Sequence, residues 1–158
     1  MPRSRPPGAL RVQRSMSATP KQAWDLIADI TRMGEWSPET IAAAWQGGAT
    51  GPALGTRFKG TNRNGSKQWR STCTVTACEP GRRFAFHVSI GPFNVADWAY
   101  EFEPTDDGCV VIELWEDRRG ALVTWLAPAI TGTTDRASRN QETMTVTLDR
   151  LAAAAESS

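Results

Sequence analysis

The last segment of the chain constrains the fold most, because it shows helical periodicity without a break from about Asp135 to Glu156. At 3.6 residues per turn, one side of this helix carries a stripe of apolar and small polar residues. A helix with such a stripe packs against another layer, and the only partner large enough is a sheet formed by the preceding residues. The stripe comprises Ala137, Asn140, Gln141, Met144, Leu148, Leu151 and Ala155, whereas Arg136, Arg139, Glu142, Asp149 and Arg150 fall largely on other sides.

The two halves of this stripe differ in character. The first half is small and polar (Ala137, Asn140, Gln141), and the second half is aliphatic. Small polar residues do not fill a core, so the first half of the helix is expected to border a cavity.

Length and charge limit the classes of protein to consider. A chain of 158 residues forms one domain that buries roughly 70% of its unfolded surface without a disulfide or metal. We expect a flexible tail over residues 1–8 and a single domain over residues 9–158. The 18 basic and 17 acidic side chains nearly cancel, which argues against binding to nucleic acid. The oligomeric state stays open between a monomer and a homodimer.

No segment of the sequence has the form of a membrane span or a signal peptide. The most hydrophobic window, Ala121–Ile130, has about half of the roughly 20 residues that a spanning helix needs, and it contains Pro128. We therefore expect a soluble, cytoplasmic protein with no stable membrane insertion.

The cysteines and the single histidine give no metal signature. Cys73, Cys78 and Cys109 are odd in number and lack the CxxC spacing, and His87 has no ligand partner at a recognised interval. We expect no metal and no cofactor, and Cys73 is expected to be a small buried hydrophobe.

The rest of the chain alternates strand patterns with turn signals. Residues 10–17 predict a first strand, and Thr19, Pro20 and Gln22 predict the start of a short helix that ends near Gly34. Hairpin signals at residues 62–65, 79–81, 90–92 and 106–108 indicate an antiparallel meander. The predicted strands of this meander are residues 41–45, 56–61, 68–78, 83–90, 95–103 and 109–117.

This order of elements resembles the Bet v 1-like or START-related superfamily (SRPBCC), in particular its polyketide cyclase/dehydrase-type members. The resemblance is carried by "SATPKQAWDLIADI", "EWSPE", "CTVTACEPGRRFAF", "WAYEFEPTDDGCVVIELWEDRR" and "ETMTVTLDRLAAAAE", and it covers about residues 10–156. It implies an α+β helix-grip fold, in which a curved antiparallel sheet of about seven strands wraps around the long C-terminal helix. It also implies a cavity for a hydrophobic ligand between them.

Strand alternation predicts which side chains face that cavity. Residues 109–117 are ambiguous by pattern, and the resemblance favours the register in which Glu113 faces inward. The alternation within residues 83–90 places His87 on the outer face. The predicted inward residues are Trp69, Ser71, Cys73, Val75, Ala77, Phe84, Phe86, Val88, Ile90, Trp98, Tyr100, Phe102, Cys109, Val111, Glu113 and Trp115.

Glu113 is the sharpest functional hint in the sequence. A buried carboxylate without a partner is costly, so it is usually paired, protonated or functional. In one interpretation Glu113 forms a salt bridge or reaches solvent through a shifted register. In the other it anchors a ligand or acts as a general acid/base, with Tyr100 as the second catalytic candidate.

The candidate pocket combines aromatic side chains with a few polar groups, as small-molecule sites do. Trp125 and Leu126 either cover the cavity mouth or pack against the sheet edge. The predicted ligand-binding residues are Trp69, Cys73, Phe86, Trp98, Tyr100, Glu113, Trp115, Asn140, Gln141 and Met144.

Two functions fit this site. The first is binding of a hydrophobic small molecule, such as a lipid, polyketide or aromatic metabolite, without chemistry. The second is a polyketide cyclase/aromatase-like enzyme, in which polar groups of the pocket transfer protons. A third class, a protein-interaction domain, has no exposed amphipathic helix in the sequence to support it.

Overall fold

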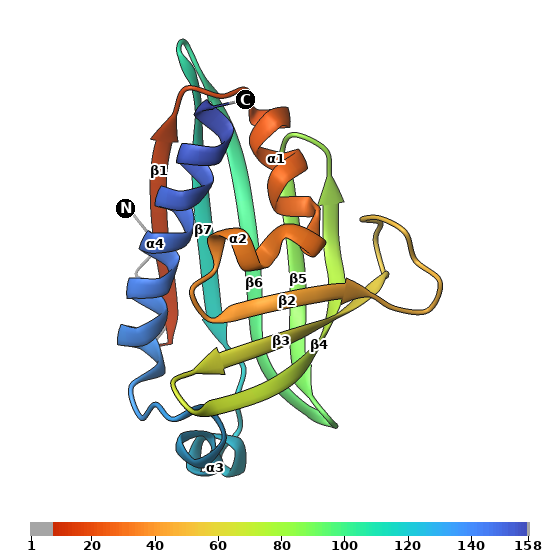
Figure 1. Ribbon diagram of the computed structural model, residues 1–158, viewed down its shortest axis with the longest axis vertical. Helices are drawn as coiled ribbons and strands as arrows, with labels where there is room; N and C mark the ends of the chain where they lie inside the picture. Colours follow the sequence, from red (N-terminus) through yellow and green to blue (C-terminus); the bar gives the residue numbers. More distant parts are fainter. Residues whose placement is uncertain (1–7, 158) are drawn as a thin grey trace, which may run out of the picture.

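The computed structural model describes residues 8–157, and these form one curved antiparallel sheet with helices along its inner side (Figure 1). Within that range the sheet has seven strands in the order β1-β7-β6-β5-β4-β3-β2. The helix-grip fold is therefore confirmed. The strands are β1 (Ala9–Met16), β2 (Thr40–Trp45), β3 (Arg57–Asn64), β4 (Lys67–Glu79), β5 (Arg83–Ile90), β6 (Phe93–Thr105) and β7 (Gly108–Asp117).

The helices begin and end where local chemistry favours it. In α1 (Pro20–Ala28), Thr19 and Gln22 form the predicted capping box, and Pro20 occupies the first turn. A 3₁₀ turn, η1 (Ile30–Arg32), and α2 (Met33–Trp36) continue the chain, and α2 ends before Pro38. The apolar window forms α3 (Ala121–Thr131), which Gly132 ends in a left-handed conformation. The last helix is α4 (Arg136–Glu156).

A bulge in β4 overturns one predicted orientation. The register between β4 and β5 shifts between Val75 and Ala77, so that Cys78 pairs with Phe84. Paired residues share a face, and Cys78 packs against the core, whereas Ala77 pairs with Ala85. The prediction that Ala77 faces inward is therefore wrong, because one extra residue reverses the alternation beyond it.

The C-terminal half of α4 is packed solidly, as its sequence predicted. Leu148 and Leu151 are 1% and 0% exposed and belong to the main core with residues of α1 and the sheet. Ion pairing of Arg14 with Asp149 and a hydrogen bond from the Ser17 N–H to Glu156 hold this half along β1. Figure 1 shows α1 beside this end of α4 and α3 near the opposite end, below the region where β2, β3 and β4 cross.

The predicted tail, residues 1–8, lies outside the described residues except for Gly8. The Gly8 carbonyl accepts a hydrogen bond from the N–H of Asp117 at 2.8 Å, so Gly8 already belongs to the β1–β7 pairing. Over residues 8–157, the structure contains no helix that is both long and apolar enough to cross a membrane.

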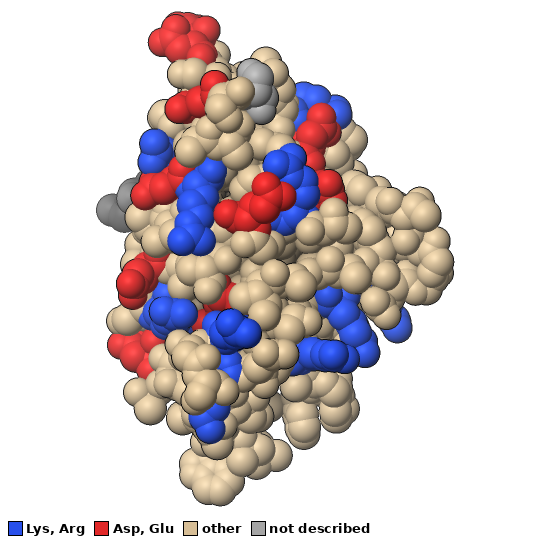
Figure 2. Space-filling view, in the orientation of Figure 1, with Lys and Arg blue, Asp and Glu red and all other residues tan. Residues whose placement is uncertain are grey.

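Charge is distributed unevenly over the surface although the totals nearly cancel. Figure 2 shows basic side chains without acidic ones over the β3–β4 side of the molecule. Within residues 8–157, the exposed cations of β3 and β4 form no ion pair, so this side is locally basic. They are Arg57, Lys59, Arg63, Lys67 and Arg70. The prediction against nucleic acid rests on net charge alone and stays a prediction.

Candidate functional site

A cavity of about 150 Å³ lies between the concave face of the sheet, the N-terminal half of α4 and the inner side of α3. Strands β3 to β7 form its floor, and Val123, Ala127 and Thr131 of α3 cover one side. Of the three small polar residues of α4 that predicted a cavity, Asn140 lines it, whereas Ala137 packs against the cluster of Ala96, Trp115 and Met144.

Aromatic rings form much of the wall. Phe58 and Phe86 pack edge to face at 5.2 Å between ring centroids, and the rings of Trp98 and Trp115 lie 6.5 Å apart. The aromatic residues that line the cavity are Trp36, Phe58, Trp69, Phe86, Trp98, Tyr100 and Trp115. Such walls suit a flat apolar ligand.

Glu113 projects into this wall and is 2% exposed. It pairs across the strands with Tyr100 and with Val12, which settles the inward register. The Tyr100 hydroxyl donates to Glu113 Oε1 at 2.7 Å, whereas Glu113 Oε2 has no partner among the described residues. Burial raises the pKa of Glu113 to about 8, and the Tyr100 hydrogen bond opposes this shift. Glu113 is therefore mostly protonated at neutral pH, and the salt-bridge interpretation is wrong.

Tyr100 responds to the same environment. Burial raises the pKa of its hydroxyl well above the usual value, and the neighbouring Glu113, once ionised, raises it further. The phenol thus remains a hydrogen-bond donor over the physiological range.

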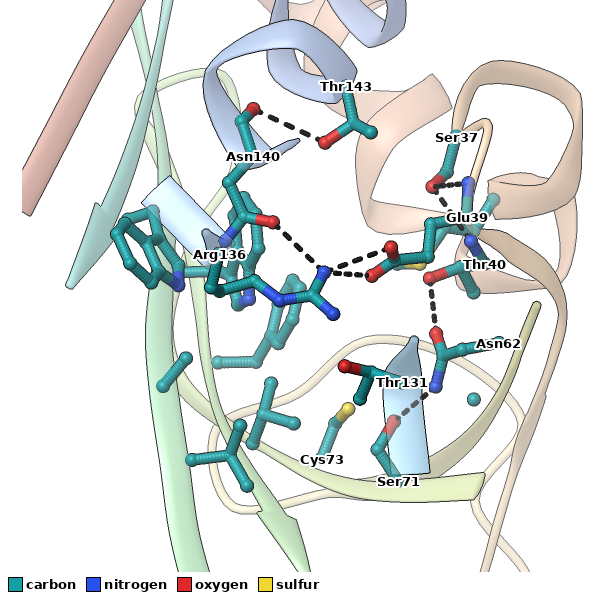
Figure 3. Close-up of a pocket in the computed structure, with 18 of the residues that line it drawn as sticks. Ser37, Glu39, Thr40, Asn62, Ser71, Cys73, Thr131, Arg136, Asn140 and Thr143 are labelled. Atoms are coloured by element: carbon teal, nitrogen blue, oxygen red, sulfur yellow. Dashed lines mark hydrogen bonds and ion pairs between the residues drawn. The ribbon is translucent and has the colours of Figure 1, made fainter. Parts of the chain in front are cut away.

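Arg136, in the first turn of α4, reaches into the cavity (Figure 3). Its Nη1 donates to both carboxylate oxygens of Glu39, at 2.7 and 2.9 Å, and lies 3.4 Å from Asn140 Oδ1. The guanidinium lies over the Trp69 ring, 5.8 Å from its centroid. Its Nη2 is buried and has no partner within residues 8–157. Contacts on three sides therefore fix a charged group that still has a free donor.

A chain of polar side chains crosses the cavity floor opposite Arg136 (Figure 3). Thr40 donates to Asn62 Oδ1 at 2.8 Å, and Asn62 Nδ2 donates to Ser71 Oγ at 3.1 Å. Ser37 Oγ accepts from the N–H of Thr40 at 3.0 Å. These groups satisfy one another. Within residues 8–157, the buried side-chain polar atoms without a partner are Glu113 Oε2 and Arg136 Nη2.

Eight of the ten predicted ligand-binding residues line the cavity; whether they bind a ligand stays a prediction. Gln141 is exposed, and Met144 is 1% exposed in a packed cluster with Ala96 and Trp115, so both placements at the cavity are wrong. The residues that do line it are Trp69, Cys73, Phe86, Trp98, Tyr100, Glu113, Trp115 and Asn140.

Helical geometry explains both errors and one omission. The cavity-facing row of α4 runs through Arg136, Asn140, Thr143 and Thr147, one step around the helix from the aliphatic row. The prediction that Arg136 falls on another side of the helix is therefore wrong. Its spacing of four residues from Asn140 was the signal that could have placed it.

The apolar window before α4 also differs from prediction. Trp125 is 77% exposed, so it neither covers the cavity nor packs against the sheet edge, and Leu126 is 37% exposed. Val123 and Ala127 of the same helix face the cavity instead.

His87 lies outside the cavity, and the Cys73 thiol at the cavity is not reactive because it stays protonated. His87 faces outward, within 2.6 Å of Asp97 and 2.9 Å of Asn94. All three cysteines are free, and burial raises the pKa of Cys73 to about 12. No group of three or more metal-ligating side chains occurs within the described part of the chain.

Comparison with known proteins agrees with this architecture. Residues 8–156 match the model of a family described as polyketide cyclase/dehydrase and lipid transport. The chain belongs to this family. None of the curated proteins matches the sequence.

Solved structures share the fold. A polyketide-cyclase-like protein from Corynebacterium glutamicum is 28% identical, with a TM-score of 0.54 over 98% of this chain and 85% of that one. The di-domain ARO/CYC StfQ from the steffimycin biosynthetic pathway is 12% identical, with a TM-score of 0.74 over 95% of this chain and 51% of that one. Major latex-like protein 151 from Panax ginseng is 10% identical, with a TM-score of 0.70 over 94% and 97%.

Proposed function

We propose that this protein binds a hydrophobic small molecule in the cavity between the sheet, α3 and α4. The observation that carries the proposal is the cavity itself, because a void lined by aromatic side chains would otherwise forfeit packing energy. The family description, which includes lipid transport, supports the same function.

The size of the cavity limits the ligand. A volume of about 150 Å³ resembles that of an engineered apolar cavity that admits benzene. The cavity therefore fits a molecule built on one aromatic ring, and a larger ligand requires displacement of α3.

Titration with an apolar one-ring probe, 4-isopropyltoluene, tests this proposal by isothermal titration calorimetry and thermal unfolding. We expect binding with a negative heat-capacity change and a raised Tm. Ala127→Phe, at a cavity-lining position that is 7% exposed, should abolish binding. Ala129→Phe, exposed on the same helix, is the matched control and should retain it. Absence of binding to the wild type, or equal binding by both variants, would contradict the proposal.

A polyketide cyclase/aromatase-like activity is the second candidate, and the Tyr100–Glu113 pair favours it. A carboxyl group whose pKa is about 8 exchanges its proton near physiological pH, as a general acid/base must. The likeness to StfQ supports the fold for such an activity. Glu113→Gln separates the two functions: an enzyme loses turnover of a candidate poly-β-ketone substrate at least 100-fold. Unchanged turnover would exclude Glu113 as the acid/base.

A further inference from the structure

Two buried polar atoms in the same cavity have no hydrogen-bond partner within residues 8–157: Glu113 Oε2 and Arg136 Nη2. Native proteins satisfy nearly all buried polar groups, because each unsatisfied one loses its hydration without compensation. Both residues line the cavity, so an occupant of the cavity is the candidate partner for both atoms.

Arg136 carries positive charge that its carboxylate neighbours do not fully balance. Its guanidinium stays charged at all relevant pH values, and its side chain is only 11% exposed. Glu39, its carboxylate partner, is shared with Arg139, whose Nε lies 3.4 Å from Glu39 Oε2. One carboxylate thus faces two guanidinium groups. The other arginine at the cavity, Arg119, pairs with Asp117, with Nη2 to Oδ2 at 2.8 Å. The charge of Arg136 also lowers the pKa of Asp117, so two carboxylates face three guanidinium groups and one positive charge is left over.

The unpaired guanidinium nitrogen of Arg136, Nη2, points into the cavity. In Figure 3 the Nη1 side of the guanidinium meets Glu39 and Asn140, and the other terminal nitrogen faces the hollow above Cys73 and Thr131. Glu39, Asn140 and Trp69 hold the guanidinium in this orientation, so little side-chain entropy is lost when an anion binds.

Glu113 requires a different partner. Tyr100 donates to Oε1, so the proton of the neutral carboxyl group lies on Oε2 and needs an acceptor. No cationic side chain contributes to the pKa of Glu113, which reflects burial and Tyr100 alone. An uncharged oxygen, such as a carbonyl, fits this place better than a second anion.

We propose that the ligand is a flat, one-ring acid that places its anionic group on Arg136 Nη2 and an uncharged acceptor oxygen on Glu113 Oε2, with its ring against the aromatic wall. This inference rests on the proposed function, because it names the class of molecule that the cavity binds.

Four matched one-ring probes test it by isothermal titration calorimetry at pH 6.5. They are 4-acetylbenzoate, 4-acetylbenzamide, 4-isopropylbenzoate and 4-isopropyltoluene. The amide removes the negative charge at nearly constant shape, and the isopropyl group replaces the carbonyl oxygen by a methyl group. We expect 4-acetylbenzoate to bind about tenfold or more tightly than the amide, and about three- to tenfold more tightly than 4-isopropylbenzoate.

Arg136→Gln locates the anion site. This variant should lose the preference for 4-acetylbenzoate over the amide and should keep its affinity for 4-isopropyltoluene within about twofold. Arg150→Gln, which removes an exposed arginine from the same helix, should keep the preference. If circular dichroism shows that Arg136→Gln does not fold, the probe series on the wild type decides the question alone.

The outcomes separate this inference from the proposed function. Binding of 4-isopropyltoluene without any preference for the acid would overturn the inference and leave the proposed function standing. An acid preference that persists in Arg136→Gln would also overturn it. If none of the four probes binds, the proposed function fails together with the inference.

Discussion

Glu113 should make the protein less stable as pH rises, and Glu113→Gln should remove this effect. The carboxyl group is 2% exposed, and burial raises its pKa from 4.5 to about 8. Below pH 4.5 both the folded and the unfolded states carry the proton, so Glu113 contributes no pH dependence. Between 4.5 and 8 the unfolded state ionises while the folded state stays protonated, and the unfolding free energy falls. Above 8 both states are ionised, and the loss is complete.

The magnitude follows from the shift. At about 1.36 kcal/mol per pKa unit, the full loss is roughly 5 kcal/mol, and about half of it falls between pH 5 and pH 7. That is a large part of the 5–15 kcal/mol by which domains are typically stable. Gln imitates the neutral carboxyl group, since its carbonyl accepts from Tyr100 and its amide takes the place of the Oε2 proton.

Urea unfolding of the wild type and Glu113→Gln at several pH values from 4.5 to 9 measures the effect. The variant should match the wild type within about 1 kcal/mol near pH 5 and exceed it increasingly toward pH 8. Glu103→Gln removes an exposed carboxylate from β6 and should stay within about 0.5 kcal/mol of the wild type throughout. Parallel stability curves for the wild type and Glu113→Gln would refute the buried, protonated state of Glu113.

Three further variants or reagents test the packing. Gly108→Ala would force a methyl carbon into the Met16 carbonyl oxygen, so it should cost about 1–3 kcal/mol in urea unfolding; an unchanged midpoint would contradict this close approach. Leu148→Ala, in the packed half of α4, should cost about 2–5 kcal/mol, and Thr143→Ala, at the cavity, less than about 1.5 kcal/mol. The reverse order would mean that the cavity lies elsewhere. In native protein, an aromatic disulfide reagent should modify Cys78 first, because Cys73 and Cys109 are 4% and 0% exposed. Equally fast reaction of all three thiols would contradict that burial.

Most of the fold could be predicted because its determinants are local. The hairpin signals, the Thr19–Gln22 capping box and the periodicity of α4 depend on residues close in sequence, and the turns, the start of α1 and the extent of α4 agree with prediction. The predicted end of the first helix near Gly34 is wrong, because α1 ends at Ala28 and a 3₁₀ turn separates it from α2. The inward register of Glu113, which the strand pattern leaves ambiguous and the family resemblance favours, is confirmed by its pairing with Tyr100 on β6.

The wrong predictions have two causes: an extra residue that reverses a strand, and side-chain positions on α4 that depend on contacts distant in sequence. The bulge between Val75 and Ala77 has no signature in the sequence and reverses the strand beyond it. The predictions for Gln141 and Met144 fail because the helical period does not distinguish the two adjacent rows that α4 presents, of which only one faces the cavity. Arg136 was missed because burial of its charge depends on Glu39, which is 97 residues away in sequence.

Native mass spectrometry of the protein purified from its own host tests the central claim most directly. We predict a persistent additional mass of small-molecule size on the wild type and on Ala129→Phe, and its absence from Ala127→Phe, in which the cavity is filled. The bare mass of the wild type across repeated preparations, or an additional mass that Ala127→Phe retains, would contradict a ligand in this cavity.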